Sequence, residues 1–155
     1  MSRSAICSKI GEARLSHANW IRRARHLIDG LPVGEEFIPL DSTECHFGQW
    51  FYDEVMKFKS VPLFYGTLSE IEEQHSRLHN IYMHIYKIYF VDTKPSWIRS
   101  LITRQRKSVS AKMREKAQRH FVELQLVSEE LLSALDVFEA KVKSTTSEVF
   151  AELAV

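Results

Sequence analysis

Apolar residues recur every three to four positions along successive stretches of the chain, which is the spacing of helices that bury one face. The first stretch predicts a helix from about Ser4 to Asp29. Gly30 and Pro32 should end this helix, because glycine commonly follows the last helical turn and proline cannot continue it. We expect residues 31–41 to form a loop.

The second stretch predicts a helix that continues to about Lys59. Asp41, Ser42 and Thr43 are all good N-caps, so the helix should begin at one of them. Gly48 lies inside this helix, where glycine costs about 1 kcal/mol relative to alanine. Its presence indicates that another helix approaches the chain closely at this point.

The third stretch predicts a helix from about Leu68 to Val91, after a linker over residues 61–66 that contains a proline and a glycine. Thr67 and Glu70 have the spacing of a capping box, in which two side chains bond free N–H groups at the start of a helix. We therefore expect the helix to begin directly after the linker.

The last third of the chain combines a basic helical segment, residues 96–119, with a final helix over about 112–150. The part from Arg99 to Arg119 carries eight Lys or Arg and one acid, whereas the remainder of the chain is acidic. The apolar positions of the final helix have a clear helical spacing. They are Phe121, Leu124, Val127, Leu131, Leu135, Phe138 and Val142.

Every periodic stretch has helical spacing, and none alternates with the period of two that a strand requires. We therefore predict an all-α fold: an antiparallel four-helix bundle with an extra or extended C-terminal helix. A chain of 155 residues is most simply one domain over residues 1–155, with its motif-bearing core at about 10–92.

Composition and charge restrict the functional classes. The net charge of +1 gives the molecule no strong attraction to nucleic acid or to a membrane surface. No apolar run reaches the roughly 20 residues of a membrane-spanning helix, and the N-terminus lacks the apolar core of a signal peptide. Two cysteines are too few for a disulfide scaffold. We expect a cytoplasmic protein without membrane insertion.

The basic segment allows two interpretations. It could contact nucleic acid, anionic lipid or an acidic partner, or it could be a solvated helix face that balances the acidic end of the chain. It lacks the interleaved aromatic residues that single-strand binders use for stacking. We favour the solvated face and expect no nucleic-acid binding.

The candidate chemistry lies in three histidines and a cysteine. His75 and His79 are four residues apart in a predicted helix, so their imidazoles share one face, one turn apart. Cys45 should lie in the first turn of its helix, where the helix dipole lowers the pKa of a thiol. Together with His17, these side chains make a complete tetrahedral ligand set for zinc.

The alternatives to zinc fit less well. A cluster of three imidazoles and a thiol without metal would be expensive to bury. A di-iron centre needs bridging carboxylates in matched Glu-x-x-His motifs, and Glu72 and Glu73 near His75 have no such matched partner on another helix. Four protein ligands also leave no open position for catalysis, so we expect no enzymatic activity. The remaining histidines are predicted to be surface or satisfied core residues: His26, His46, His84 and His120.

Three motifs occur in order: His17-x-x-Trp20, Cys45-x-Phe-Gly-x-Trp50 and His75-x-x-x-His79. These three motifs, in this order, resemble those of the bacterial chemoreceptor zinc-binding domain family. The resemblance implies a helical-bundle sensor with a 3-His/1-Cys zinc site, usually joined to a chemoreceptor or a diguanylate cyclase and commonly dimeric. Relatives in the family are associated with hypochlorite sensing. The chain itself contains no recognisable output domain.

These observations lead to two functional hypotheses. In the first, the chain is a stand-alone zinc sensor that reports metal, or oxidation of Cys45, to a chemotaxis or cyclic-di-GMP partner through altered helix packing. In the second, it is a structural or adaptor bundle in which zinc only stabilises the fold. We expect a homodimer in either case, because a long terminal helix with an apolar stripe can form a dimer interface.

Overall fold

The computed structural model of the chain describes residues 2–31, 33, 39–91 and 109–146. All regular structure in these ranges is helical, which confirms the predicted all-α bundle. The elements in chain order are α1 (Arg3–Ile28), α2 (His46–Trp50), η1 (Phe51–Val55), η2 (Met56–Ser60), α3 (Pro62–Tyr86), η3 (Lys87–Val91) and α5 (Ala111–Ser144).

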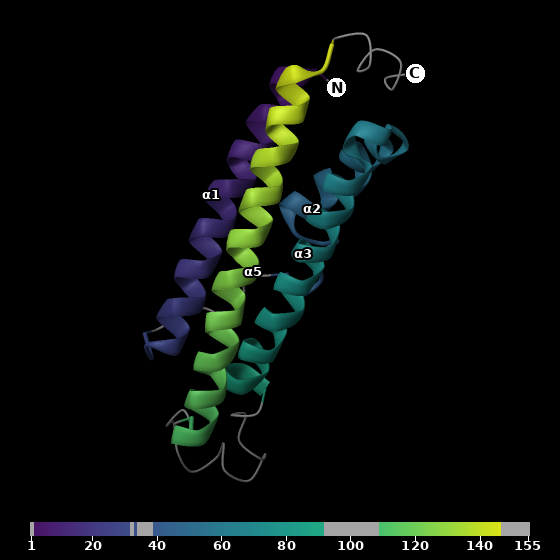
Figure 1. Cartoon of the computed structure of the whole chain (residues 1–155). Coiled ribbons are helices and arrows are strands. Elements are labelled where there is room, and N and C mark those ends of the chain that lie inside the picture. The colour runs from purple at the N-terminus through teal and green to yellow at the C-terminus, as the bar shows by residue number, and fades with distance from the viewer. Residues whose placement is uncertain (1, 32, 34–38, 92–108, 147–155) are drawn as a thin grey trace.

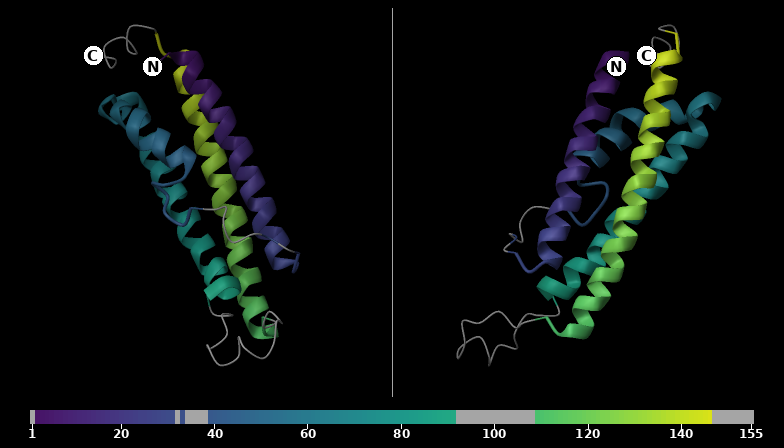
Figure 2. Two further views of the ribbon diagram at one scale, coloured as in Figure 1. Left: turned by 180° about the vertical axis from the view of Figure 1, so that it is seen from behind. Right: turned by 60° about the vertical axis from the view of Figure 1, so that its left-hand side comes forward.

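The helices are arranged as an antiparallel bundle. In Figure 1, α1 and α3 run downward while α5 runs upward between them, and α2 with η1 and η2 rises beside the upper half of α3. The two further views in Figure 2 show the same arrangement, with α5 against both α1 and α3. The second helical stretch, which consists of α2, η1 and η2 over residues 46–60, is shorter than each of α1, α3 and α5.

The core follows the predicted periodicity. Every apolar position predicted for the final helix is buried, and so are the inward positions of α1. Phe64 of α3 meets Phe138 of α5 edge to face, with ring centroids 5.7 Å apart. Such aromatic pairs contribute about 0.5–1.5 kcal/mol beyond the area that they bury. The α3–α5 contact is thus a main part of the apolar core of the bundle.

The first helix agrees closely with the sequence. The N-cap hydroxyl of Ser2 accepts a hydrogen bond from the Ala5 N–H, and Asp29 caps the other end. Gly30 follows with φ of 77°, in the left-handed region that glycine enters without steric cost. The predicted stop signal is confirmed.

The predicted start of the second helix is wrong. The helix begins at His46, and Cys45 is its N-cap. Asp41 instead accepts hydrogen bonds from the backbone N–H and the hydroxyl of Thr43, both at 2.8 Å, which closes a local turn. Asp and Thr favour such turns as strongly as they favour N-caps, so the sequence signal was ambiguous.

The predicted linker before the third helix is also wrong, together with its capping box. The helix α3 begins at Pro62, whose missing N–H and fixed φ suit the first helical position. Gly66 lies within the helix. Thr67 is buried and accepts a hydrogen bond from the ammonium of Lys141 on α5 at 2.6 Å, so it does not cap anything. The π-helix η3 extends α3 to Val91, the last residue described before residues 92–108, so the end at Val91 stays a prediction.

The final helix starts where expected, with Ser110 as N-cap, but it ends at Ser144 rather than near 150. Thr145 adopts an extended backbone, and the hydroxyls of Ser144 and Thr145 both donate to the carbonyl of Lys141. Side chains that bond the last carbonyls in this way offer the backbone an alternative to helix. Residues 92–108 and 147–155, including most of the basic segment, lie outside the described part of the chain.

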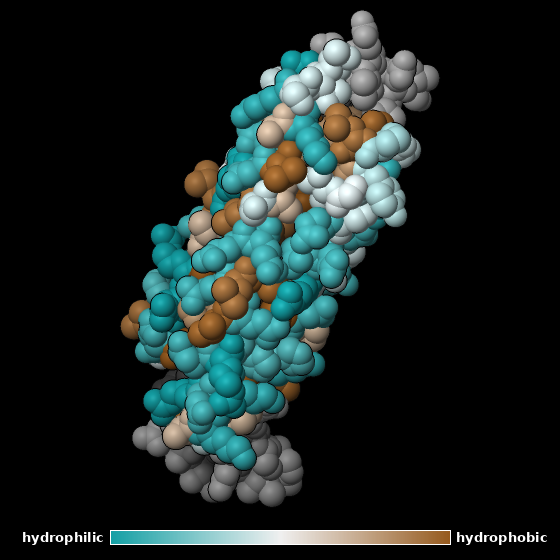
Figure 3. All heavy atoms as spheres, in the orientation of Figure 1, coloured by the Kyte–Doolittle hydropathy of each residue, from teal (hydrophilic) through white to brown (hydrophobic). Residues whose placement is uncertain are grey.

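The surface is mixed. Figure 3 shows that the face in front of α5 is largely hydrophilic, with separate apolar patches over this helix. Exposed apolar side chains on α5 include Val122, Leu126 and Val137. None of the described helices is both long and apolar enough to cross a membrane.

Candidate metal centre

Three of the predicted ligands converge in the upper half of the bundle. His75 and His79 come from successive turns of α3, and Cys45 comes from the start of α2. One potential ligand atom from each residue lies within 4.8 Å of the others. Cys45 Sγ is 3.3 Å from Nε2 of His75. This is the donor set that zinc prefers, namely thiolate sulfur with imidazole nitrogen.

Cys45 takes its position from the helix N-terminus that it caps. Its Sγ accepts a hydrogen bond from the Gly48 N–H at 3.1 Å and lies 3.5 Å from the Ser42 carbonyl. Burial nevertheless raises the pKa of the thiol, and the N–H groups of Gly48 and Phe47 offset only part of that effect. The prediction that the thiol pKa is lowered overall is therefore wrong: the N–H groups at the helix start do lower it, but desolvation of the thiolate has the larger effect.

Gly48 makes the turn around Cys45 possible. A Cβ atom at this position would lie 1.7 Å from the Ser42 carbonyl oxygen and 3.3 Å from Cε1 of His75. The predicted close approach is present, although the nearest neighbour is the preceding turn of the same segment. The helix α3 contributes the second contact through His75 itself.

The two α3 histidines are held neutral. Burial lowers the pKa of His75 to about 2 and that of His79 to about 4, and the neighbouring imidazoles act in the same direction. Their rings lie 4.7 Å apart and nearly perpendicular. Nδ1 of each ring is buried without a hydrogen-bond partner. Neutral imidazoles are the form that binds metal, so the lowered pKa values fit a metal ion.

His17 lies beside this cluster but is not part of its tight core. The side chain is 3% exposed, and its ring centroid is 5.7 Å from that of His75. The ring nitrogen Nδ1 lies 2.8 Å from the Ala13 carbonyl and donates to it, which leaves Nε2 as the free lone pair. A backbone carbonyl on the second nitrogen is the usual way to orient a histidine ligand. The sequence analysis missed this role of Ala13, although the i−4 spacing would have indicated it.

Aromatic rings enclose the cluster. Trp20 packs on His79 with centroids 4.6 Å apart, and Phe47 packs on His75 at 4.8 Å. They shield the imidazoles from water on these sides. A cavity of about 280 Å³ opens beside the cluster, and Cys45 forms part of its wall.

The comparison with protein families agrees with this geometry. Residues 17–86 match the family model of the chemoreceptor zinc-binding domain, an interval that starts at His17 and contains all three converging ligands. The chain carries a chemoreceptor zinc-binding domain. The comparisons with curated proteins and with solved structures returned no match.

The other histidines lie outside the ligand cluster of this zinc-binding domain. His46 lines the cavity, but its potential ligand atoms do not join those of Cys45, His75 and His79. His84 on α3 and His120 on α5 stack with centroids 5.1 Å apart, near the other end of the bundle. The zinc-binding domain therefore offers one described cluster with the chemistry that zinc requires.

Proposed function

We propose that this chain is a zinc sensor domain in which His17, Cys45, His75 and His79 hold one zinc ion. The observation that carries the proposal is the convergence of a thiol and two neutral imidazoles, next to a third imidazole already oriented by a backbone carbonyl. Bound zinc would supply four strong bonds that join α1, the start of α2 and α3. The chemoreceptor zinc-binding family is a regulatory rather than a catalytic one, and the proposal follows it.

Metal content tests the site directly. Purified protein supplied with zinc should contain one zinc per chain by elemental analysis, and His79→Ala and Cys45→Ser should lose it. Cys7→Ser and the exposed His26→Ala are matched controls that should keep it. A parent protein without zinc, or variants that retain it, would refute the four-ligand site.

The sensing function depends on what happens to the helices when the metal leaves. The residues of α1 and α2 would lose the bonds that bring His17 and Cys45 to α3, while the apolar α3–α5 contact persists. We expect zinc removal to lower amide protection in α1 and in residues 46–60, with little change in α3 and α5. The segment formed by α1 and residues 46–60 would thus pack differently with and without zinc. This change could alter the activity of a partner such as a chemoreceptor or a diguanylate cyclase.

The alternative function is structural. If zinc only stabilises the bundle, hydrogen exchange should slow uniformly on zinc binding and partner affinity should not change. The same exchange experiment therefore decides between the two functions, provided that metal analysis has first established binding.

Oxidation offers a second input at the same site. Cys45 is the sulfur ligand, and its place in the cavity wall gives small molecules a route to it. Hypochlorous acid would oxidise the thiolate to sulfenic acid and leave as chloride, a two-electron step that weakens the sulfur–zinc bond. We expect zinc release on oxidation, unchanged by Cys7→Ser. If mass spectrometry shows that Cys45 is oxidised while the parent keeps its zinc, this input is refuted.

A homodimer through α5 completes the proposal. The exposed side chains of Val122, Leu126 and Val137 follow one face of this helix. The start of α5 is rich in lysine and arginine, and the part beyond Glu123 is acidic. Two copies that pack antiparallel could place the basic start of each α5 against the acidic residues between Glu129 and Glu139 of the other, so the partner that fits this face is a second copy.

The oligomeric state tests this interface. Light scattering should show a dimer for the parent and a monomer for Leu126→Glu, whereas Leu15→Glu on the exposed face of α1 should leave the dimer intact. A parent that is monomeric at all concentrations would refute the dimer without affecting the zinc site.

A further inference from the structure

The metal centre draws on two different parts of the bundle. Cys45 caps α2, and His75 and His79 lie on α3, with the short η1 and η2 between these two helices in the chain. His17 alone comes from α1, and α1 packs chiefly against α5. The distance between His17 and the other three ligands therefore depends on how α5 holds α1.

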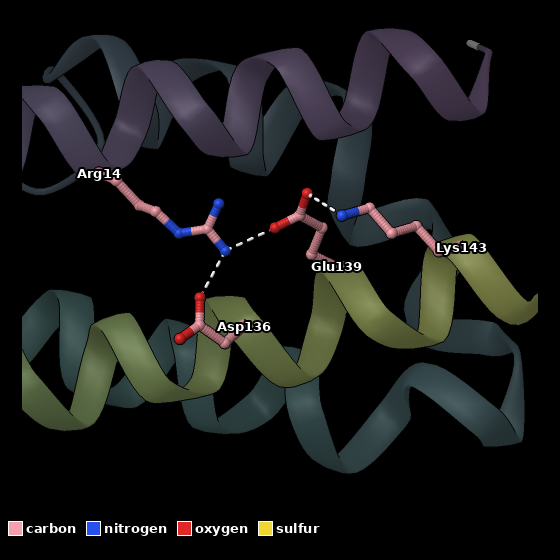
Figure 4. Close-up of polar contacts among 4 residues, drawn as sticks. All are labelled: Arg14, Asp136, Glu139 and Lys143. Atoms are coloured by element: carbon pink, nitrogen blue, oxygen red, sulfur yellow. Dashed lines mark hydrogen bonds and ion pairs between the residues drawn. The ribbon is translucent and has the colours of Figure 1, made fainter.

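A cluster of charges joins α1 to α5 one turn before His17. The guanidinium of Arg14 donates to Asp136 at 2.5 Å and to Glu139 at 2.6 Å (Figure 4). The other oxygen of Glu139 accepts from Lys143 at 2.7 Å. Figure 4 shows Arg14 reaching across from α1 between two carboxylates that α5 presents on successive turns.

This cluster differs from an ordinary surface ion pair. The side chain of Glu139 is 17% exposed and that of Arg14 is 30% exposed, so water screens the contact less than at a fully exposed pair. Hydrogen bonds from Lys143 and Arg14 lower the pKa of Glu139, which remains charged at neutral pH. Because the same Nη2 of Arg14 bonds carboxylates on two successive turns of α5, a shift of α1 along α5 would lengthen at least one of these bonds.

The clamped turn is the turn that orients His17. Ala13, whose carbonyl accepts from Nδ1 of His17, directly precedes Arg14 in the chain. The backbone between Ala13 and His17 is one continuous helical turn of α1. A shift of Arg14 along α5 would therefore carry the His17 imidazole with it.

We propose that Arg14 is a positioning residue for the fourth zinc ligand: its clamp on Asp136 and Glu139 sets where α1 presents His17 to the other three. The inference rests on the proposed zinc site. It couples zinc binding to the contact between α1 and α5. Zinc bound by His17 would stabilise the ion pairs of Glu139, and these ion pairs would raise the affinity for zinc by the same factor. The loss or gain of zinc would therefore act on α5 at the turn that carries Asp136 and Glu139.

A double-mutant cycle tests this role. Zinc affinity would be measured by competition with a chromophoric chelator for the parent, Arg14→Gln, His17→Ala and the double variant. Loss of an outer residue that orients a ligand typically costs 10–100-fold in metal affinity, and we expect about 10-fold for Arg14→Gln. In the His17→Ala background the same substitution should change affinity by less than about 2-fold, because no ligand remains for it to position.

Two further variants separate positioning from general stability. Glu139→Gln should weaken zinc about as much as Arg14→Gln, and the two together should lose no more than either alone. Arg22→Gln, at an exposed position of α1 where the side chain bonds only locally to Asn19, should leave affinity unchanged.

The outcomes are distinguishable. An equal loss for Arg14→Gln with and without His17 would overturn the positioning role and leave the zinc site intact. No loss for Arg14→Gln would do the same. A parent that binds no zinc would refute the site itself, and this inference with it.

Discussion

The two parts of the metal centre differ in how the chain brings their ligands together. Cys45, His75 and His79 converge through elements that are close together in sequence, and their ligand atoms already lie within 4.8 Å of one another. His17 arrives on a helix that packs mainly on α5, and it lies at the edge of the cluster. The first part is therefore a preformed site, whereas the second is adjustable. The proposed sensor would use both, because a fully rigid site would not change shape on losing its metal.

The largest effect should follow from breaking the preformed part. His75→Ala removes a ligand that faces Cys45 directly, and we expect zinc affinity to fall by at least about 100-fold. Competition with a chelator of known affinity measures this loss. A reduction below about 10-fold would mean that the three ligands do not act as one site.

The next effect concerns the turn that carries Cys45. Gly48→Ala would place a Cβ atom 1.7 Å from the Ser42 carbonyl, so the turn must move, and we expect a loss of about 1–3 kcal/mol in the free energy of unfolding. Gly66→Ala is the matched control, because its Cβ would meet open space in a helix interior. Gly66→Ala should raise the free energy of unfolding, measured by urea denaturation, by about 0.5–1 kcal/mol. Equal effects at both positions would contradict the steric role of Gly48.

Removal of the adjustable ligand should have a smaller effect. His17→Ala leaves three protein ligands and room for water, an arrangement that many zinc sites use. We expect affinity to fall by about 10-fold, and hydrogen exchange should show that zinc no longer protects α1 while it still protects residues 46–60. Continued protection of α1 would show that His17 does not couple this helix to the metal.

The smallest effect is the pH dependence of the Arg14 clamp. The pKa of Glu139 is lowered from 4.5, so the clamp contributes its full stability above that value and loses it as pH falls through the lowered pKa. In metal-free protein the stability difference between the parent and Arg14→Gln should be below about 1 kcal/mol at pH 7. Urea unfolding should show that this difference in unfolding free energy between the parent and Arg14→Gln becomes smaller on acidification. A difference that stays constant to acid pH would exclude the ionic origin.

Much of the fold could be predicted because the signals are local. The apolar spacing located α1 and the buried face of α5, and the four-residue spacing of His75 and His79 placed both rings on one face. The errors arose where one local signal has two outcomes. Pro62 and Gly66 were interpreted as a linker, yet proline also begins helices and α5 supports the first turn of α3 through Lys141.

The sequence by itself determined the helical class and the identity of the candidate ligands, since periodicity and residue chemistry are properties of the chain alone. Only the tertiary structure decided how the ligands divide into a tight group of three and an outlying His17, because that depends on which helix each element packs against. It also decided the thiol pKa of Cys45, which burial raises although the helix start would lower it. The clamp between Arg14 and Glu139 joins residues that are 125 positions apart, so no local pattern could reveal it.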